Sequence, residues 1–260
     1  MSASAQWSDL RARVISAFLM ALVGAFAVWQ GGLFYVELVS IICGIMVWET
    51  ARMFQAKQAI ALGVAAAIVL NVVHFLPGIF AAPLLIAMGL VAAGQTDRDK
   101  PVLFGVVIWV LFGSFALLLL RTAAGTGWIL WLVFVVVASD VAGYFAGRSL
   151  GGPKFWPKIS PKKTWSGTVA GWLGAALVGV AFIGTLGSTG ALVFVSILVG
   201  FAGQMGDIAQ SAVKRRQGVK DSSDLIPGHG GVFDRFDAML GAGALTVLLW
   251  AFGMLPGAGA

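Results

Sequence analysis

Charged side chains are scarce in this 260-residue chain: Asp, Glu, Lys and Arg together make up 11% of it, against 59% hydrophobic residues. A soluble domain of this length cannot hide so much apolar surface, so the composition excludes one and predicts contact with lipid. The net charge of +6 is no indication of a nucleic-acid partner. It is what cytoplasmic loops near anionic lipid, or near a phosphorylated substrate, are expected to carry.

Cysteine and strand-like alternation are also lacking. The single cysteine, Cys43, cannot form an internal disulfide, and its position in an apolar run is explained by packing. Polar and apolar residues do not alternate, whereas apolar runs of about 16–20 residues, the length of a membrane-spanning helix, recur. Because only helices and closed barrels satisfy every backbone group in hydrocarbon, we predict an all-α, polytopic integral membrane protein.

The hydrophobic runs predict about nine transmembrane helices. They lie near residues 14–29, 33–49, 59–76, 77–93, 102–120, 128–146, 168–186, 191–208 and 238–255. The first run has features of a signal peptide, because Arg11 and Arg13 precede it and Ala25-Phe26-Ala27 resembles a cleavage site. The apolar run continues to Trp29 and the second run follows almost at once, which favours a retained helix.

The distribution of basic residues supports this count. With nine spans, sixteen of the seventeen Lys and Arg residues fall in the N-terminal tail or in alternate connections, and only Arg121 falls on the other side. By the positive-inside rule, the N-terminus and the basic loops are cytoplasmic. We interpret residues 1–125 as a transmembrane scaffold and residues 126–260 as a catalytic region with cytoplasmic loops at 147–167 and 209–237.

Three carboxylates lie within the predicted spans, where a charge at mid-bilayer costs at least ~2.5–3.5 kcal/mol. Glu37 and Glu49 lie near the ends of their span, so we expect them to reach water and to have structural roles. Asp140 shares a helix face with Tyr144 and Arg148, as a structural ion pair would. Because this helix leads directly into the most basic loop, a functional role for Asp140 is the favoured interpretation.

Glycine and proline exclude a long helix between residues 151 and 168. The loop carries four hydroxyl side chains and four lysines, the latter at positions Lys154, Lys158, Lys162 and Lys163. Such a loop is suited to clamping phosphate groups. Charge alone equally allows a cytoplasmic loop that grips anionic lipid headgroups.

The polar character of the chain is concentrated between residues 203 and 237, which hold five of the eleven acidic residues and one of the two histidines. The eighth helix is expected to continue to Gln217 and to end at Gly218. Its residues Asp207, Ser211, Lys214 and Arg215 share one face. A carboxylate, a hydroxyl and two cations on one face suit a metal-bound polyphosphate.

The second half of this stretch is a loop followed by the last helix. Pro227-Gly228-His229-Gly230-Gly231 lets backbone N–H groups approach an anion, and His229 is a candidate substrate contact. Asp234 and Asp237 then lie one turn apart. The loop is long enough to bring Asp207 and Asp234 together around Mg²⁺, which is held by a few carboxylates and substrate phosphates. A structural salt-bridge network is the alternative.

The motif resembles the phosphatidate cytidylyltransferase family, also called CDP-diacylglycerol synthases. The matching residues are Ser211-Ala-Val-Lys214-Arg215, Val219-Lys220-Asp221, Pro227-Gly-His229-Gly230-Gly231 and Asp234-Arg235-Phe-Asp237. Ser139-Asp140 through Arg148 and Ile159 through Thr164 are also similar to this family. The resemblance covers roughly residues 135–240, whereas the first 120 residues match only in being hydrophobic.

The resemblance implies transfer of a cytidylyl group from CTP to phosphatidic acid, a polytopic protein of the bacterial inner membrane, and a homodimer. It implies Mg²⁺, with K⁺ as a second cation, at Asp207 and Asp234. It places Lys214, Arg215, Lys220 and Asp221 in catalysis. The expected substrate contacts are Asp140, Lys162, Lys163, Ser211, His229, Gly230, Gly231, Arg235 and Asp237. The chain departs from the family at Gln210 and Ser166, where the family commonly has Glu.

Two alternatives remain at this point. A CTP-dependent lipid kinase would release CDP where a cytidylyltransferase releases pyrophosphate. A transporter with a basic cytoplasmic gate would have ionisable residues distributed through several spans, whereas here they are concentrated at one surface.

Overall fold

The computed structural model describes residues 3–258, with side chains from Val14 onward. The side chains of Arg11 and Arg13, which the predicted charge asymmetry includes, therefore lie outside the described residues. Within the described part of the chain there are nine α-helices and one two-stranded hairpin, in agreement with the predicted all-α class. The chain forms two compact units. The first comprises the residues up to Leu111 together with 217–236, and the second comprises 112–216 together with the residues from Asp237 onward.

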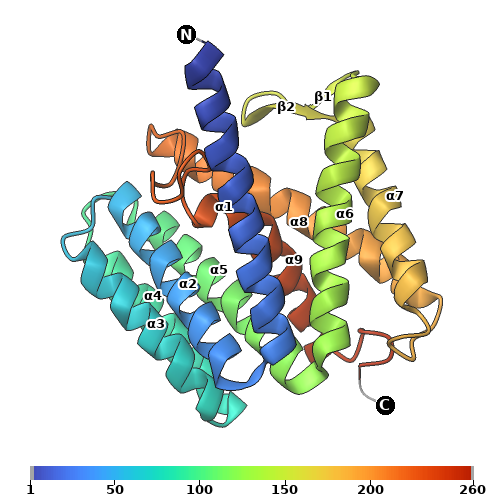
Figure 1. Cartoon of the computed structure of the whole chain (residues 1–260). Helices are drawn as coiled ribbons and strands as arrows, with labels where there is room; N and C mark the ends of the chain where they lie inside the picture. Colours follow the sequence, from blue (N-terminus) through green and yellow to red (C-terminus); the bar gives the residue numbers. More distant parts are fainter. Residues whose placement is uncertain (1–2, 259–260) are drawn as a thin grey trace. The chain divides into compact units, whose positions relative to one another are not determined.

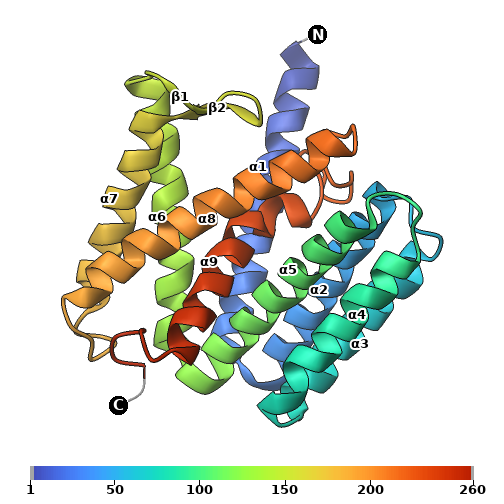
Figure 2. The same cartoon turned by 180° about the vertical axis from the view of Figure 1, so that it is seen from behind.

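The first unit is a layer of apolar helices joined by short turns. It contains α1 (Ala3–Gln30), α2 (Gly32–Met53), α3 (Ala59–Phe75), the 3₁₀ turn η1 (Gly78–Phe80), α4 (Ala81–Gly94) and the first part of α5 (Lys100–Leu119). Helix α2 packs along α3, and α3 packs against α4. The three helices lie side by side in both views (Figures 1 and 2).

The second unit is built around α6, α7 and α8. It begins with the end of α5 and the π-helical turn η2 (Leu120–Ala124), and continues with α6 (Thr126–Ser149), β1 (Lys154–Trp156), β2 (Ser160–Thr164), α7 (Trp165–Phe182), α8 (Ala191–Arg216) and the part of α9 (Phe233–Ala251) from Asp237. Helix α6 packs along α7, which also packs against α8. The hairpin β1–β2 caps one end of the α6–α7 pair (Figure 1).

Each of the nine predicted spans corresponds to a helix of the structure. By length and apolar composition, five helical segments can cross a membrane: Gly32–Met53, Lys100–Ala124, Thr126–Ser149, Trp165–Phe182 and Ala191–Arg216. Shorter apolar helices cover Val14–Gln30, Ala59–Phe75 and Gly78–Gly94. Helix α8 ends at Arg216, one residue before the predicted end, and Gly218 adopts a φ of 73°, as a glycine that terminates a helix does. The direction in which the chain crosses the membrane stays a prediction.

The basic loop after α6 has more regular structure than we expected from its glycines and prolines. Strands β1 and β2 pair antiparallel, with Lys154 opposite Thr164 and Trp156 opposite Ser160. The Trp165 N–H donates to the Pro153 carbonyl oxygen at 3.0 Å, and the Phe155 and Trp165 rings meet edge to face. Cross-strand and aromatic contacts of this kind stabilise a hairpin that local propensity does not reveal.

Candidate functional site

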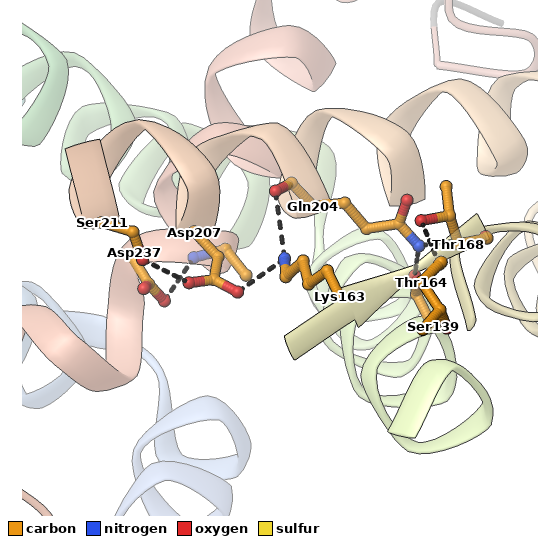
Figure 3. A network of polar contacts seen from close by, with 9 residues as sticks. Ser139, Lys163, Thr164, Thr168, Gln204, Asp207, Ser211 and Asp237 are labelled. Carbon is orange, nitrogen blue, oxygen red and sulfur yellow. Dashed lines mark hydrogen bonds and ion pairs between the residues drawn. The ribbon is translucent and has the colours of Figure 1, made fainter. Parts of the chain in front are cut away.

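One polar face of α8 carries Asp207 and Ser211, one turn apart as predicted. The Ser211 hydroxyl lies 3.4 Å from Asp207 Oδ1 and donates to it. The other oxygen, Oδ2, lies 2.6 Å from Lys163 Nζ, which comes from strand β2 (Figure 3). The structure therefore brings the basic hairpin and the α8 carboxylate together, two features that the sequence placed in separate segments.

Strand β2 holds Lys163 in this position through two further contacts with the helices. Lys163 Nζ also donates to the backbone carbonyl oxygen of Gln204 at 3.3 Å, one turn before Asp207 on α8 (Figure 3). The next residue, Thr164, caps α7 by accepting the Gly167 N–H at 3.2 Å. Because Thr164 is buried and held at the start of α7, the backbone at Lys163 is held as well, and its side chain is directed toward α8.

Asp237 lies beside this face, at the point where α9 approaches α8. A Cβ at position 206 would overlap the Asp237 carbonyl oxygen, so Gly206 is needed for the close approach of the two helices. Asp237 lies just before the span expected over 238–255. Its carboxyl is buried, and burial, reinforced by the neighbouring Asp207 carboxylate, raises its pKa to about 7. Two carboxylates this close are a donor set for a hard cation.

Asp140 on α6 has neighbours other than those we expected from its helix face. Arg148 donates to the Tyr144 hydroxyl oxygen at 2.7 Å, so these two residues do pair. Asp140, in contrast, is close enough to Lys163 and Asp207 to interact with both electrostatically. The charged groups gathered in the second unit are therefore Asp140, Lys163, Asp207, Lys214 and Asp237.

Most of the remaining predicted residues lie in the first unit, in the loop from Gln217 to Val232 and at the start of α9. Asp234 Oδ2 accepts three hydrogen bonds: from the Ser222 N–H at 2.8 Å, the Ser222 hydroxyl at 3.0 Å and the Gly231 N–H at 2.9 Å. Asp234 therefore joins the two ends of the loop, at Ser222 and Gly231, through its side chain. Lys220, Asp221 and Arg235 lie exposed on the same unit, and Arg215 and Lys162 are exposed on the second unit.

His229 is held by a residue that we did not predict. Its Nδ1 lies 2.8 Å from the Ser16 hydroxyl on α1, and its carbonyl oxygen accepts the Arg235 Nε–H at 3.1 Å. The contact with Ser16 orients the imidazole ring, whichever of the two groups donates, because a serine hydroxyl can both donate and accept. A lone serine in an apolar helix gives no local sign of this contact.

Glu49 is the second residue that sequence reasoning missed. We expected its side chain to reach water, but it is fully buried and accepts four hydrogen bonds from the loop that carries His229. Glu37, in contrast, is exposed and accepts one hydrogen bond from Asn71, as expected of a structural residue. The difference arises because residues 222–233 pack over the end of α2.

The two departures from the family pattern have different surroundings. Gln210 is fully buried within α8. The Ser166 hydroxyl donates to the Gly151 carbonyl oxygen and lies 3.0 Å from the Thr164 hydroxyl, so it ties the hairpin to the start of α7. A serine at 166 thus has a local structural role of its own.

Within the part of the chain that the structure describes, no group of three or more His, Cys, Asp or Glu side chains is arranged to hold a metal ion alone. The Asp207–Asp237 pair still fits Mg²⁺, because this ion is bound by one or two carboxylates together with substrate phosphates and water. Asp207 and Asp234 belong to different compact units, and a cation shared by those two residues stays a prediction.

Comparison with known proteins extends the resemblance to almost the whole chain. The profile of the Cytidylyltransferase family matches residues 11–252. The chain is 33% identical over 261 residues, 94% of each protein, to "Phosphatidate cytidylyltransferase" of Brucella suis. It is 32% identical over 252 residues, 92% of each protein, to the Helicobacter pylori protein of the same name. The first helices, which we had considered similar only in hydrophobicity, therefore belong to the shared region.

Proposed function

The chain belongs to the cytidylyltransferase family, and from this premise we propose how its charged residues transfer a cytidylyl group from CTP to phosphatidic acid. The products are CDP-diacylglycerol and pyrophosphate, and the enzyme is a multi-pass membrane protein of phospholipid biosynthesis. The observation that carries the proposal is the Lys163–Asp207–Asp237 group. It combines a cation for phosphates with two carboxylates for a metal ion, in a family match that spans residues 11–252.

The reaction needs no general base. The phosphate of phosphatidic acid is already an anion at neutral pH, so one of its oxygens attacks the α-phosphorus of CTP without losing a proton to the enzyme. The new P–O bond forms as the bond between the α-phosphorus and the bridging oxygen breaks, and pyrophosphate leaves with that oxygen. The barrier is the repulsion between two anions and the charge that develops on the leaving group.

Cationic side chains lower this barrier. In the second unit, Lys163 is next to the Asp207 carboxylate, and Lys214 is close to Asp237. The exposed side chains of Lys162 and Arg215 are neighbours of these two lysines in the sequence. Their charges stabilise the phosphate oxygens, and Lys163 is held in place before the reaction begins by Asp207 and the Gln204 carbonyl oxygen. Ser211 and Asp140 orient this group. In the first unit, the residues that the sequence pattern assigns to phosphate contacts are Lys220, His229, Gly230, Gly231 and Arg235, and Asp221 orients Lys220.

Mg²⁺ is the cofactor that this donor set suits. Bound at carboxylates, it would neutralise phosphate oxygens and the developing charge on pyrophosphate. The sequence pattern assigns Asp207 and Asp234 as its ligands, with K⁺ as a second cation. Asp237, which lies close to Asp207, is a further candidate ligand. The enzyme acts as a homodimer in the bacterial inner membrane, with its active site facing the cytoplasm.

Position-specific labels in CTP test the proposed reaction. Purified enzyme with Mg²⁺, phosphatidic acid and CTP labelled at the α-phosphate is expected to give labelled lipid and pyrophosphate. Label that reaches lipid only from the γ-phosphate, with release of CDP, would instead identify a lipid kinase.

Asp207→Ala should abolish the transfer while the protein remains in the membrane. Asp97→Ala, at an exposed aspartate that pairs with Lys57, is the matched control and should retain activity. Near-normal synthesis by Asp207→Ala refutes the assignment.

A further inference from the structure

Glu49 belongs to α2, but the partners of its carboxylate lie in a distant segment, the loop that carries His229. It lies near the end of α2, 173 residues before the first loop residue that it contacts, and its side chain is fully buried. Each carboxylate oxygen accepts one hydroxyl and one backbone N–H. Oε1 accepts from the Ser223 hydroxyl at 2.5 Å and the Val232 N–H at 2.9 Å. Oε2 accepts from the Ser222 hydroxyl at 3.2 Å and the Phe233 N–H at 2.7 Å.

These four contacts hold both ends of one loop. Ser222 and Ser223 lie just after Lys220 and Asp221, whereas Val232 and Phe233 follow Gly231 and begin α9. One carboxylate thus joins the start and the end of the segment that carries His229. Hydrogen bonds to an ionised acceptor are roughly twice as strong as neutral ones, so a buried carboxylate is a stronger anchor than an amide of the same shape.

The glycine at position 231 is required by the same anchor. A Cβ at this position would overlap the Ser222 hydroxyl and lie 2.5 Å from Glu49 Oε1. The Gly231 N–H meanwhile donates to Asp234 at 2.9 Å. The single Ser222 hydroxyl proton is shared between Glu49 Oε2 at 3.2 Å and Asp234 Oδ2 at 3.0 Å, so the two carboxylates act on the loop as one connected network.

We propose that Glu49 is a positioning residue of the enzyme: its buried carboxylate holds the loop from Ser222 to Phe233 in the conformation that presents His229, Gly230 and Gly231 to the phosphates. It does not contact substrate itself. Its negative charge is used within the protein, to order N–H and O–H donors. The kinetic consequence rests on the proposed function, whereas the anchoring of the loop does not.

Glu49→Gln separates anchoring from overall stability. Glutamine has the same shape, but it has one carbonyl oxygen and one NH₂ group where the carboxylate has two acceptors, so the two donors at one of these positions lose Glu49 as their acceptor. Hydrogen exchange measured by mass spectrometry should become faster in the peptide that covers residues 222–233, and stay unchanged in α3 and α6. A residue with a merely structural role would accelerate exchange throughout the first unit. Unchanged exchange in 222–233 overturns the proposal.

Kinetics test the positioning role. In the same variant, kcat/KM for CTP should fall by about tenfold or more, the loss expected when hydrogen bonds to a buried charged group are removed. The melting temperature should fall by only a few degrees, because buried donors that lose their acceptor cost about 1–3 kcal/mol. Glu49→Asp, which keeps the charge on a shorter side chain, should recover part of both the exchange protection and kcat/KM. Full activity in Glu49→Gln, with a loop that exchanges faster, refutes the positioning role.

Glu37→Gln is the matched control, because Glu37 belongs to the same helix but is exposed and accepts one hydrogen bond, from Asn71. It should leave exchange and kcat/KM unchanged. The exchange and kinetic experiments also separate the proposed reaction from the proposed anchoring role of Glu49. If the wild-type protein transfers no cytidylyl group, the proposed function fails, while the exchange experiment still decides whether Glu49 anchors the loop.

Discussion

Replacement of Lys163 tests the ion pair that this residue forms with Asp207 in the second unit. Lys163 Nζ lies 2.6 Å from Asp207 Oδ2, and the two side chains are 25% and 38% exposed. In Lys163→Met the side chain keeps much of its apolar stem but loses its charge. Asp207 then loses its cation partner, and the phosphates lose a nearby positive group.

The magnitude follows from the distance and the exposure. At 2.6 Å and an effective dielectric constant of about 20, the gross Coulomb attraction is ~6 kcal/mol. Desolvation and solvent screening remove most of it for partly exposed groups, and we expect a net coupling of about 1–2 kcal/mol, between the values for surface and buried pairs. Loss of a preorganised group that stabilises transition-state charge lowers kcat by about 10²–10³-fold. We therefore expect kcat/KM for CTP to fall about 100-fold.

The assay is release of pyrophosphate from CTP and phosphatidic acid in detergent micelles at saturating Mg²⁺. Lys57→Met is the matched control: Lys57 forms an ion pair with Asp97 at 3.7 Å, and the side chains are 70% and 80% exposed. Surface pairs of this kind contribute about 0–1 kcal/mol, so the control should stay within about threefold of the wild type. If Lys163→Met loses no more activity than Lys57→Met, Lys163 has no role in the reaction.

Two further predictions concern the carboxylates and the helix crossing beside them. Chelation of divalent cations should abolish turnover, and added Mg²⁺ should restore it, because the carboxylate pair Asp207 and Asp237 suits a hard cation; activity that survives exhaustive chelation argues against a metal site. Gly206→Ala should destabilise the protein by about 1–3 kcal/mol, because the new Cβ would overlap the Asp237 carbonyl oxygen and force α9 from α8. The thermal midpoint in detergent measures this effect. Gly105→Ala, at a helical glycine with nothing within 4 Å of an added Cβ, should leave the midpoint unchanged or slightly raise it.

The positions of the helices could be predicted because lipid permits few solutions. A run of about twenty apolar residues has to satisfy its backbone internally, so length and hydropathy locate a helix without knowledge of its neighbours. Helix α9 shows the limit of this reasoning. It begins at Phe233, before the apolar run, because Asp234 and Gly231 form part of a hydrogen-bonded turn that leads into it.

Candidate residues in the polar stretch could also be predicted, since ionisable side chains next to apolar spans are costly to keep and commonly mark a functional site. Their partners could not. Asp207 and Ser211 are one helical turn apart, and their contact follows from the helix period. Lys163 reaches Asp207 from a hairpin that depends on pairing across the turn and on an aromatic contact. Nothing local to either residue specifies that distance.

By itself, the amino-acid sequence determined the helical membrane class, the position of each helix, and the family that the pattern from Ser211 to Asp237 resembles. Those properties depend on composition and on spacing along the chain, which are local. Only the tertiary structure revealed that Glu49 is an anchor of the loop, that Ser16 contacts His229, and that Asp237 lies close to Asp207. Each depends on where segments far apart in the chain meet. A glutamate in the sequence can face water, lipid or hydrogen-bond donors of the protein, and only the surroundings in the folded chain decide its role.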